Sequence, residues 1–282
     1  MTQRESIVFA ESEDGLALTG LLIAPAAPQT DLGIVWVHGN TASFADAPYV
    51  RIGREVAARG LPFLSADTRG HHISAALFHA DGREVAGGCA WERLEEAPRD
   101  LAPWVAELAR RGVRRVVVAG HSQGAAKVVA YAAERADPIV AGIVLASPSL
   151  RGHWPAEQAA EAARLVAAGA PDTLLPPIEG APWYRLSAGN LVSRERMLAR
   201  TYVAADGAPL IGRVACPILA FFGTGGDVGG AGDLATIRAN ARATPRLDTL
   251  LIPGADHVYT GVEAATAAQI AAWVRDSLSG GA

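Results

Sequence analysis

The chain has 282 residues, of which 50% are hydrophobic and 19% are charged, and its formal net charge is −4. A chain of this length can bury one large core and folds as roughly one or two domains. The small negative charge gives no support to a nucleic-acid or anionic-membrane partner, and we expect neither. Cys89 and Cys216 are too few for a disulfide framework and favour a reducing compartment, although one bond between them stays open.

The N-terminal residues do not resemble a targeting segment. Residues 1–6 are polar, whereas a signal peptide needs an apolar run. No segment contains the ~20 consecutive apolar residues that a membrane helix needs. We therefore expect a cytoplasmic protein that has no membrane partner.

The chain begins with two expected strands, at residues 6–10 and 16–23. The turn sequence Glu13-Asp14-Gly15 lies between them and favours a hairpin. After residue 28 short, continuously apolar runs alternate with helical patterns, which is typical of a parallel sheet buried on both faces. The strands expected there are 33–37, 62–66, 116–119, 139–146, 217–222 and 250–252, and the helices are 46–59, 97–111, 123–135, 231–243 and 264–277. The pattern predicts an α/β fold with a mainly parallel eight-stranded sheet and helices on both faces.

Two segments interrupt the alternation of strands and helices. Residues 68–96 read as a long loop rich in Gly, His and Glu. Residues 149–213 carry helical patterns at 156–167 and 193–199, and this segment is too long for a simple crossover. We therefore expect a core made of residues 1–148 and 214–282, with residues 149–213 as a helical cap insertion.

The strongest chemical signal is Gly120-His121-Ser122-Gln123-Gly124, which directly follows an apolar strand and opens a helix. A turn this sharp needs glycine on both sides of the serine to avoid steric clashes. It raises the serine above the sheet edge, where the helix N-terminus stabilises negative charge. The context predicts that Ser122 is a nucleophile.

A serine hydroxyl needs a base to remove its proton, and an acid to orient that base. His257 follows the last expected strand and is the predicted base. Asp227, in the glycine-rich loop after the preceding strand, is the predicted acid, which gives the chain order Ser, Asp, His. Asp233 is the fallback, whereas Asp256 is too close to His257 in sequence to reach its ring.

Acyl transfer also needs two donors for the developing oxyanion. The backbone N–H of Gln123, the residue after the nucleophile, is expected to be one of them. The other is expected from the loop after the third strand, where the N–H of Asn40 is favoured and Thr41 is an alternative. The side chains of Asn40 and His38 are equally well explained as braces for that loop.

These motifs resemble the α/β-hydrolase superfamily over essentially the whole chain. Two further motifs are typical of that family: His38-Gly39 after one strand and Asp67-Thr68-Arg69-Gly70-His71 after the next. The resemblance implies the fold, the triad order, a cap after the sixth strand and catalysis without a metal or cofactor; Arg69 and His71 are expected to support the loop. A narrower resemblance, carried by residues 87–101 and 120–128, is to siderophore-esterase-like hydrolases.

For four further side chains the sequence allows two interpretations of their role. Lys127, the only lysine, is expected to form a structural ion pair with Glu92 or Glu96, the alternative being a lysine whose head reaches water. Within residues 149–213, the aromatic side chains that either line a substrate pocket or simply pack the cap are Trp154, Trp183 and Tyr184.

The function expected from the sequence is a serine hydrolase that cleaves a carboxylic ester of a small molecule through an acyl-enzyme intermediate. The same triad also serves thioester hydrolysis, carbon–carbon bond cleavage and acyl transfer, and a ligand sensor can retain it. The expected partner is therefore a small-molecule acyl substrate. The oligomeric state stays open, with a homodimer as one candidate.

Overall fold

The computed structural model describes residues 3–28, 30–152, 154–177, 181–226 and 228–278. Within these ranges the main sheet has eight strands in the order β1-β2-β4-β3-β7-β8-β9-β10. They are β1 (Arg4–Glu11), β2 (Ala17–Ala24), β3 (Leu32–Val37), β4 (Phe63–Ala66), β7 (Arg115–His121), β8 (Val140–Ala146), β9 (Ile218–Gly223) and β10 (Leu247–Ile252). Strand β2 is antiparallel to both β1 and β4, and every neighbouring pair from β4 to β10 is parallel. The mainly parallel sheet and its N-terminal hairpin are confirmed.

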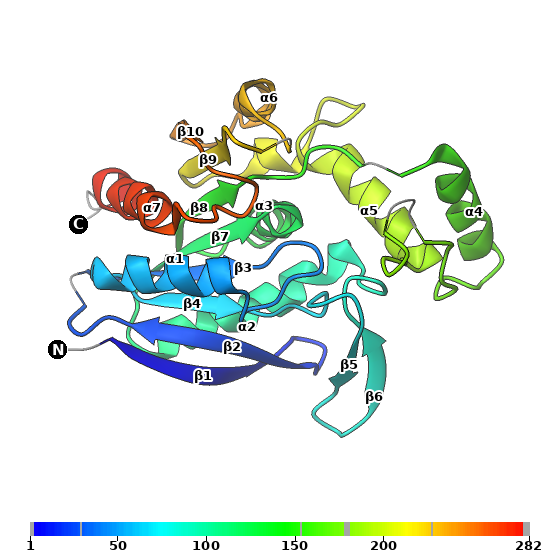
Figure 1. Ribbon diagram of the computed structural model, residues 1–282, viewed down its shortest axis with the longest axis horizontal. Helices are drawn as coiled ribbons and strands as arrows, with labels where there is room; N and C mark the ends of the chain where they lie inside the picture. Colours follow the sequence, from blue (N-terminus) through cyan, green and yellow to red (C-terminus); the bar gives the residue numbers. More distant parts are fainter. Residues whose placement is uncertain (1–2, 29, 153, 178–180, 227, 279–282) are drawn as a thin grey trace.

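Helices cover both faces of this sheet (Figure 1). The helices α1 (Ala47–Ala58) and α7 (Glu263–Leu278) share a buried cluster with Ile34 and Trp36 of β3. The helices α2 (Ala97–Arg110), α3 (Gln123–Arg135) and α6 (Ala231–Asn240) share the other cluster with Val35 and Val37. Successive residues of a strand point to opposite faces, so a continuously apolar strand such as β3 fills both cores.

The segment expected to be a loop, residues 68–96, contains more structure than its sequence suggested. It forms a small antiparallel hairpin of β5 (Ala75–Phe78) and β6 (Glu84–Gly87), followed by the 3-10 turn η1 (Leu94–Glu96). The expectation of one long loop is therefore wrong. The sequence does not reveal these strands because they are short and largely exposed and lack the apolar alternation that marks a strand.

The insertion between β8 and β9 carries α4 (Ala156–Ala167), α5 (Ala188–Thr201) and the 3-10 turn η2 (Leu210–Arg213). Helix α5 starts five residues before the predicted 193–199 because Ser187 caps it, its side chain accepting the Asn190 N–H. Met197 of α5 packs into the main core. Helix α4 packs instead against α5 through Ala162 and lies at the outer end of the molecule (Figure 1).

Two smaller expectations concern membranes and cysteines. None of the helices in the described ranges is long and apolar enough to cross a bilayer. Cys89 is buried, Cys216 is partly buried, and both are free thiols. The disulfide that the sequence left open is therefore absent between these two described residues.

Candidate active site

Ser122 lies between the end of β7 and the start of α3, with φ 54° and ψ −118°. A non-glycine residue at positive φ is strained, and such strain is typical of functional sites. A Cβ on Gly120 would collide with the carbonyl group of Gly124, and one on Gly124 would lie 2.5 Å from the carbonyl oxygen of His38. Glycine is therefore required on both sides of the serine, as predicted.

Ser122 and His257 line the same cavity, which has a volume of about 330 Å³. Ser122 is 8% exposed, and its Oγ lies 3.2 Å from the Oγ of Ser149, which also lines the cavity. The other described lining residues are Asn40, Leu94, Gln123, Ala126, Arg151, Gly152, Trp154, Tyr184, Arg194, Met197, Leu198 and Val228. Residues that follow β7 and β10 and residues of the insertion are thus brought to one place.

The loop after β10 holds His257 at this cavity. Asp256 forms a tight turn, in which its Oδ1 accepts the N–H groups of Val258 at 3.0 Å and Thr260 at 2.9 Å. Burial raises the pKa of Asp256, but these backbone donors outweigh it and hold the pKa below its usual value. Asp256 is therefore the turn-forming residue of the loop, in agreement with its rejection as the orienting acid.

His121, which precedes Ser122, connects the loops around the site. Its Nε2 donates to the carbonyl oxygen of His257 at 2.8 Å, so its Nδ1 is the acceptor for the Tyr49 hydroxyl, also at 2.8 Å. The same hydroxyl accepts the Gly39 N–H at 3.1 Å. Burial and the neighbouring His257 lower the pKa of His121 to about 3, which keeps the ring neutral. One chain of bonds therefore fixes the loops after β3, β7 and β10.

The loop after β3 is held from its other side by His38. Its Nδ1 donates to the Gly39 carbonyl oxygen at 2.8 Å, and its Nε2 accepts the N–H of Thr68 at 3.1 Å. Burial and the charge of Lys127 lower the pKa of His38 well below its usual value. The C=O and N–H of a trans peptide point in opposite directions, so the bond to Gly39 also fixes the direction of the Asn40 N–H.

Lys127 ends this chain of bonds in the interior. Its Nζ donates to the hydroxyl of Thr68 at 2.8 Å and forms an ion pair with Glu92. Both side chains of the pair are 1% exposed. The predicted structural ion pair is therefore confirmed, and its partner is Glu92, because Glu96 pairs with Arg69.

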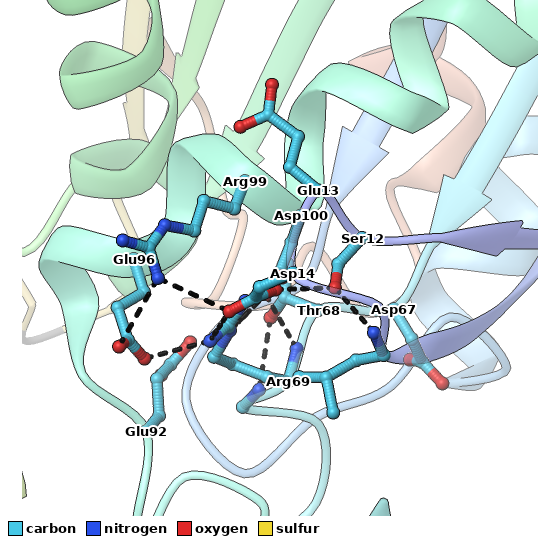
Figure 2. Close-up of polar contacts among 12 residues, drawn as sticks. Ser12, Glu13, Asp14, Asp67, Thr68, Arg69, Glu92, Glu96, Arg99 and Asp100 are labelled. Atoms are coloured by element: carbon cyan, nitrogen blue, oxygen red, sulfur yellow. Dashed lines mark hydrogen bonds and ion pairs between the residues drawn. The ribbon is translucent and has the colours of Figure 1, made fainter. Parts of the chain in front are cut away.

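Arg69 supports the loop after β4, as expected. Figure 2 shows its guanidinium among the carboxylates of Asp14, Glu96 and Asp100, at 2.7, 2.9 and 2.8 Å. Asp100 also accepts the Arg69 backbone N–H at 2.9 Å. This cluster ties the N-terminal hairpin to α2 beneath the site.

The buried Asp67 gives a testable pH dependence. Burial raises the pKa of Asp67 to about 7, although its Oδ1 accepts the Phe44 N–H at 2.8 Å. Between the unfolded pKa, about 3.9, and pH 7 the folded state holds the extra proton, so the wild type loses stability as the pH rises. From pH 5 to pH 8, Asp67→Asn should gain about 2 to 3 kcal/mol in unfolding free energy relative to the wild type. Urea unfolding of both proteins at both pH values measures this difference. An equal difference in unfolding free energy at pH 5 and pH 8 would contradict the prediction.

The predicted acid, Asp227, lies outside the described residues. The described residue Gly226 lies beside the backbone of His257, since a Cβ on Gly226 would lie 3.2 Å from the His257 nitrogen. Asp233, the fallback, forms an ion pair with Arg151 at 2.6 Å. Among the described residues, no group of three or more His, Cys, Asp or Glu side chains is placed to hold a metal ion.

The three predicted substrate-binding aromatic residues do not lie together at the cavity. Trp154 and Tyr184 line it, whereas Trp183 is 62% exposed and packs on the ring of Tyr184 at a centroid distance of 5.7 Å. The Asn40 side chain braces its loop, because its Nδ2 donates to the Tyr184 hydroxyl and its Oδ1 accepts from Arg194 at 2.7 Å. Trp154 and Tyr184 thus form part of the cavity wall, and Trp183 is not among the lining residues.

A comparison with protein-family models identifies the family of this chain. The model described as serine aminopeptidase, S33, matches residues 28–205, which is more than half of the sequence. The chain belongs to the serine aminopeptidase S33 family. It is therefore a hydrolase, and the predicted membership of the α/β-hydrolase superfamily is confirmed. The matched region of this S33 family member includes Ser122 and the loop after β3, and it ends before His257.

Solved structures share the fold of this S33 family member. Est1E from Butyrivibrio proteoclasticus aligns with a TM-score of 0.66 and 15% identity over 97% of this chain and 99% of Est1E. DcsB in complex with its substrate analogue aligns with a TM-score of 0.72 and 14% identity over 98% of this chain and 100% of DcsB. The monoacylglycerol lipase of Paleococcus ferrophilus aligns with a TM-score of 0.64 and 16% identity over 98% of this chain and 99% of the lipase. No curated protein matches the sequence significantly. At these identities the likeness concerns the fold.

Sequence reasoning missed several residues that shape the site of this S33 family member. His121 and Tyr49 carry no pattern that links them, since 72 positions separate them. Ser149 and Arg194 lie in the insertion, whose path over the sheet edge has no sequence signature. One signal was available: the histidine inside the serine motif is a polar residue at the end of a buried strand, which requires a partner.

Proposed function

We propose that this hydrolase cleaves a carboxylic ester of a small molecule through an acyl-enzyme intermediate on Ser122. His257 is the general base, and Asp227 is the acid that orients it. The observation that carries the proposal is the strained Ser122 at the N-terminus of α3, in one cavity with His257. The finer resemblance to siderophore esterases and the cytoplasmic location stay predictions.

The reaction follows in two steps. The Ser122 Oγ attacks the ester carbonyl carbon while His257 takes the hydroxyl proton, and the imidazolium then passes this proton to the leaving alkoxide. Water, deprotonated by the same imidazole, attacks the acyl-enzyme and releases the acid and the free serine. Two backbone donors stabilise the oxyanion in both steps, and we assign them to Gln123 and Asn40.

The two oxyanion donors are supported by separate arguments. Gln123 is the first residue of α3, and a first-turn amide has no acceptor within its own helix. The direction of the Asn40 N–H is fixed through the Gly39 carbonyl oxygen, which His38 holds. The donors thus stand ready before substrate binds, which is the arrangement that stabilises developing charge most strongly.

The choice of Asp227 is supported by elimination and by the path of its loop. Asp256 is used in the turn around His257, and Asp233 pairs with Arg151. The glycine-rich loop after β9 runs against the backbone of His257 at Gly226. Asp227 follows Gly226 in the sequence.

The charges around the cavity favour an ester over an aminopeptidase substrate. An aminopeptidase must bind the cationic amino terminus of a peptide, for which a carboxylate is the natural partner. The described lining residues include Arg151 and Arg194 and no Asp or Glu. Arg151 is paired with Asp233, whereas the buried guanidinium of Arg194 repels an ammonium group, so the substrate is expected to be neutral or anionic.

We assign residues 149–213 the role of a cap on the core formed by residues 1–148 and 214–282. Trp154, Arg194 and Met197 come from this segment and form one side of the cavity. Helix α5 packs on the core, whereas α4 packs on α5. A cap of this kind selects substrates by shape and charge and excludes water from the reaction.

The test combines active-site labelling with turnover. A fluorophosphonate probe should modify Ser122, located by mass spectrometry, and 4-nitrophenyl esters should be turned over many times per enzyme. Prior denaturation should abolish labelling. Faster turnover of thioesters or vinylogous diketones, or one slow turnover with tight binding, would replace ester hydrolysis by a related reaction or by ligand sensing.

A further inference from the structure

Arg194 is a buried cation that the proposed catalytic residues do not use. It lies on α5, is 5% exposed, and lines the same cavity as Ser122 and His257. Its guanidinium lies 5.8 Å from the centre of the Trp154 ring. An arginine this deeply buried is normally neutralised by a carboxylate or by a ligand.

The hydrogen bonds of Arg194 go to neutral groups. Its Nε donates to the Asn190 side chain at 2.6 Å, and its Nη2 donates to the Asn40 side chain at 2.7 Å and the Cys89 carbonyl oxygen at 3.4 Å. These bonds orient the guanidinium without cancelling its charge. In the part of the chain that the structure describes, Arg194 has no carboxylate partner, and no hydrogen bond uses its Nη1.

The second arginine of the cavity lining is different. Arg151 has a side chain that is 67% exposed, and it is paired with the buried carboxylate of Asp233 at 2.6 Å. Its charge is therefore both hydrated and neutralised. The cavity lining also includes the apolar side chains of Leu94, Met197 and Leu198. An unneutralised guanidinium in such a wall attracts an anionic ligand strongly, because the surroundings screen charge poorly.

We propose that the substrate of this hydrolase carries a carboxylate in addition to the ester, and that Arg194 binds this carboxylate. The proposal rests on the proposed ester hydrolysis and narrows its substrate class to esters with an apolar body and one anionic end. Arg194 is then a specificity-determining residue, preorganised by Asn40 and Asn190. The guanidinium presents Nη1 to the ligand, and an arginine binds a carboxylate with charge-assisted hydrogen bonds.

The test compares esters that differ only in the anionic end. One pair varies the acyl side: mono-4-nitrophenyl glutarate against 4-nitrophenyl pentanoate. The other varies the alcohol side: the butyrate ester of 3-hydroxybenzoate against phenyl butyrate. In the wild type we expect the charged ester of at least one pair to have a kcat/KM about 10- to 100-fold above that of its neutral partner, the range typical of a hydrogen-bonded charge. The pair that shows the preference identifies the side of the ester, acyl or alcohol, that carries the carboxylate. Wild-type ratios near one in both pairs would overturn the proposal.

Variants locate this preference on Arg194. Arg194→Met should abolish the ratio, and Arg194→Lys should retain part of it, because lysine keeps the charge without the planar fork. The control Arg200→Gln removes an exposed arginine of the same helix, paired with Glu134, and should keep the wild-type ratio. Equal losses for the charged and neutral esters in Arg194→Met would show a purely structural role. Absence of turnover for all four esters would instead reject the proposed function.

Discussion

Replacement of Ser122 by alanine is expected to lower kcat for ester hydrolysis by about four to six orders of magnitude. Without the hydroxyl no acyl-enzyme forms, and the base and oxyanion donors are left with water as the only nucleophile. The fold should persist, because the described hydrogen bond of the Ser122 hydroxyl is made to Ser149 alone. Single-turnover and steady-state assays with a 4-nitrophenyl ester measure the loss, and thermal unfolding checks the fold.

Ser149 provides the matched control, since its hydroxyl lies 3.2 Å from that of Ser122 in the same cavity. Ser149→Ala should retain labelling by a fluorophosphonate and lose no more than about tenfold in kcat, because its hydroxyl contributes one neutral hydrogen bond. If Ser122→Ala kept near-normal turnover, or if the probe were found on Ser149, the nucleophile assignment would be wrong.

The elements that local patterns determine were predictable from the sequence. The sequence predicts the apolar strand before Ser122 and the helix after it to within two residues, since a continuous apolar run that leads into a glycine-flanked serine is a local signal. The placement of His257 beside Ser122 follows from the same logic, because a parallel sheet brings the loops after its strands to one edge. The need for Gly120 and Gly124 is also local, since both approach backbone atoms directly.

The supporting contacts were not predictable, because they join segments whose relative placement no pattern encodes. The ion pair of Lys127 had two candidate partners, and the choice of Glu92 depends on the course of residues 68–96, which lack periodicity. Arg194 reads in sequence as one of several arginines on a polar helix. Only the packing of α5 against the core buries it and turns it toward the cavity.

The interior of the site is built in the same manner on both sides of the loop after β3. On one side, the Tyr49 hydroxyl accepts the Gly39 N–H and donates to His121. On the other, His38 donates to the Gly39 carbonyl oxygen and is held by Thr68, to which Lys127 donates. Both polar groups of Gly39 are therefore fixed by buried side chains, and the ion pair beneath Thr68 is part of the same support.

Lys127→Met should consequently lower the free energy of unfolding by about 3 to 5 kcal/mol, because it leaves the carboxylate of Glu92 buried without its counter-charge. The side chain of Glu92 is 1% exposed, and it occupies the space that a Cβ on Gly70 would fill, so it cannot turn to water without moving the loop after β4. Urea denaturation of the variant and the wild type at pH 7 measures the difference.

The matched control is the exposed pair of Arg135 and Glu13, whose side chains are each 40% exposed. Arg135→Met should cost no more than about 1 kcal/mol, since water replaces the lost partner. The double variant Lys127→Met with Glu92→Gln should recover part of the loss, because no unpaired charge remains in the interior. An equal loss of unfolding free energy in Lys127→Met and Arg135→Met would contradict this prediction. So would a double variant that recovers none of the lost free energy, because the buried ion pair would then not stabilise this side of the site.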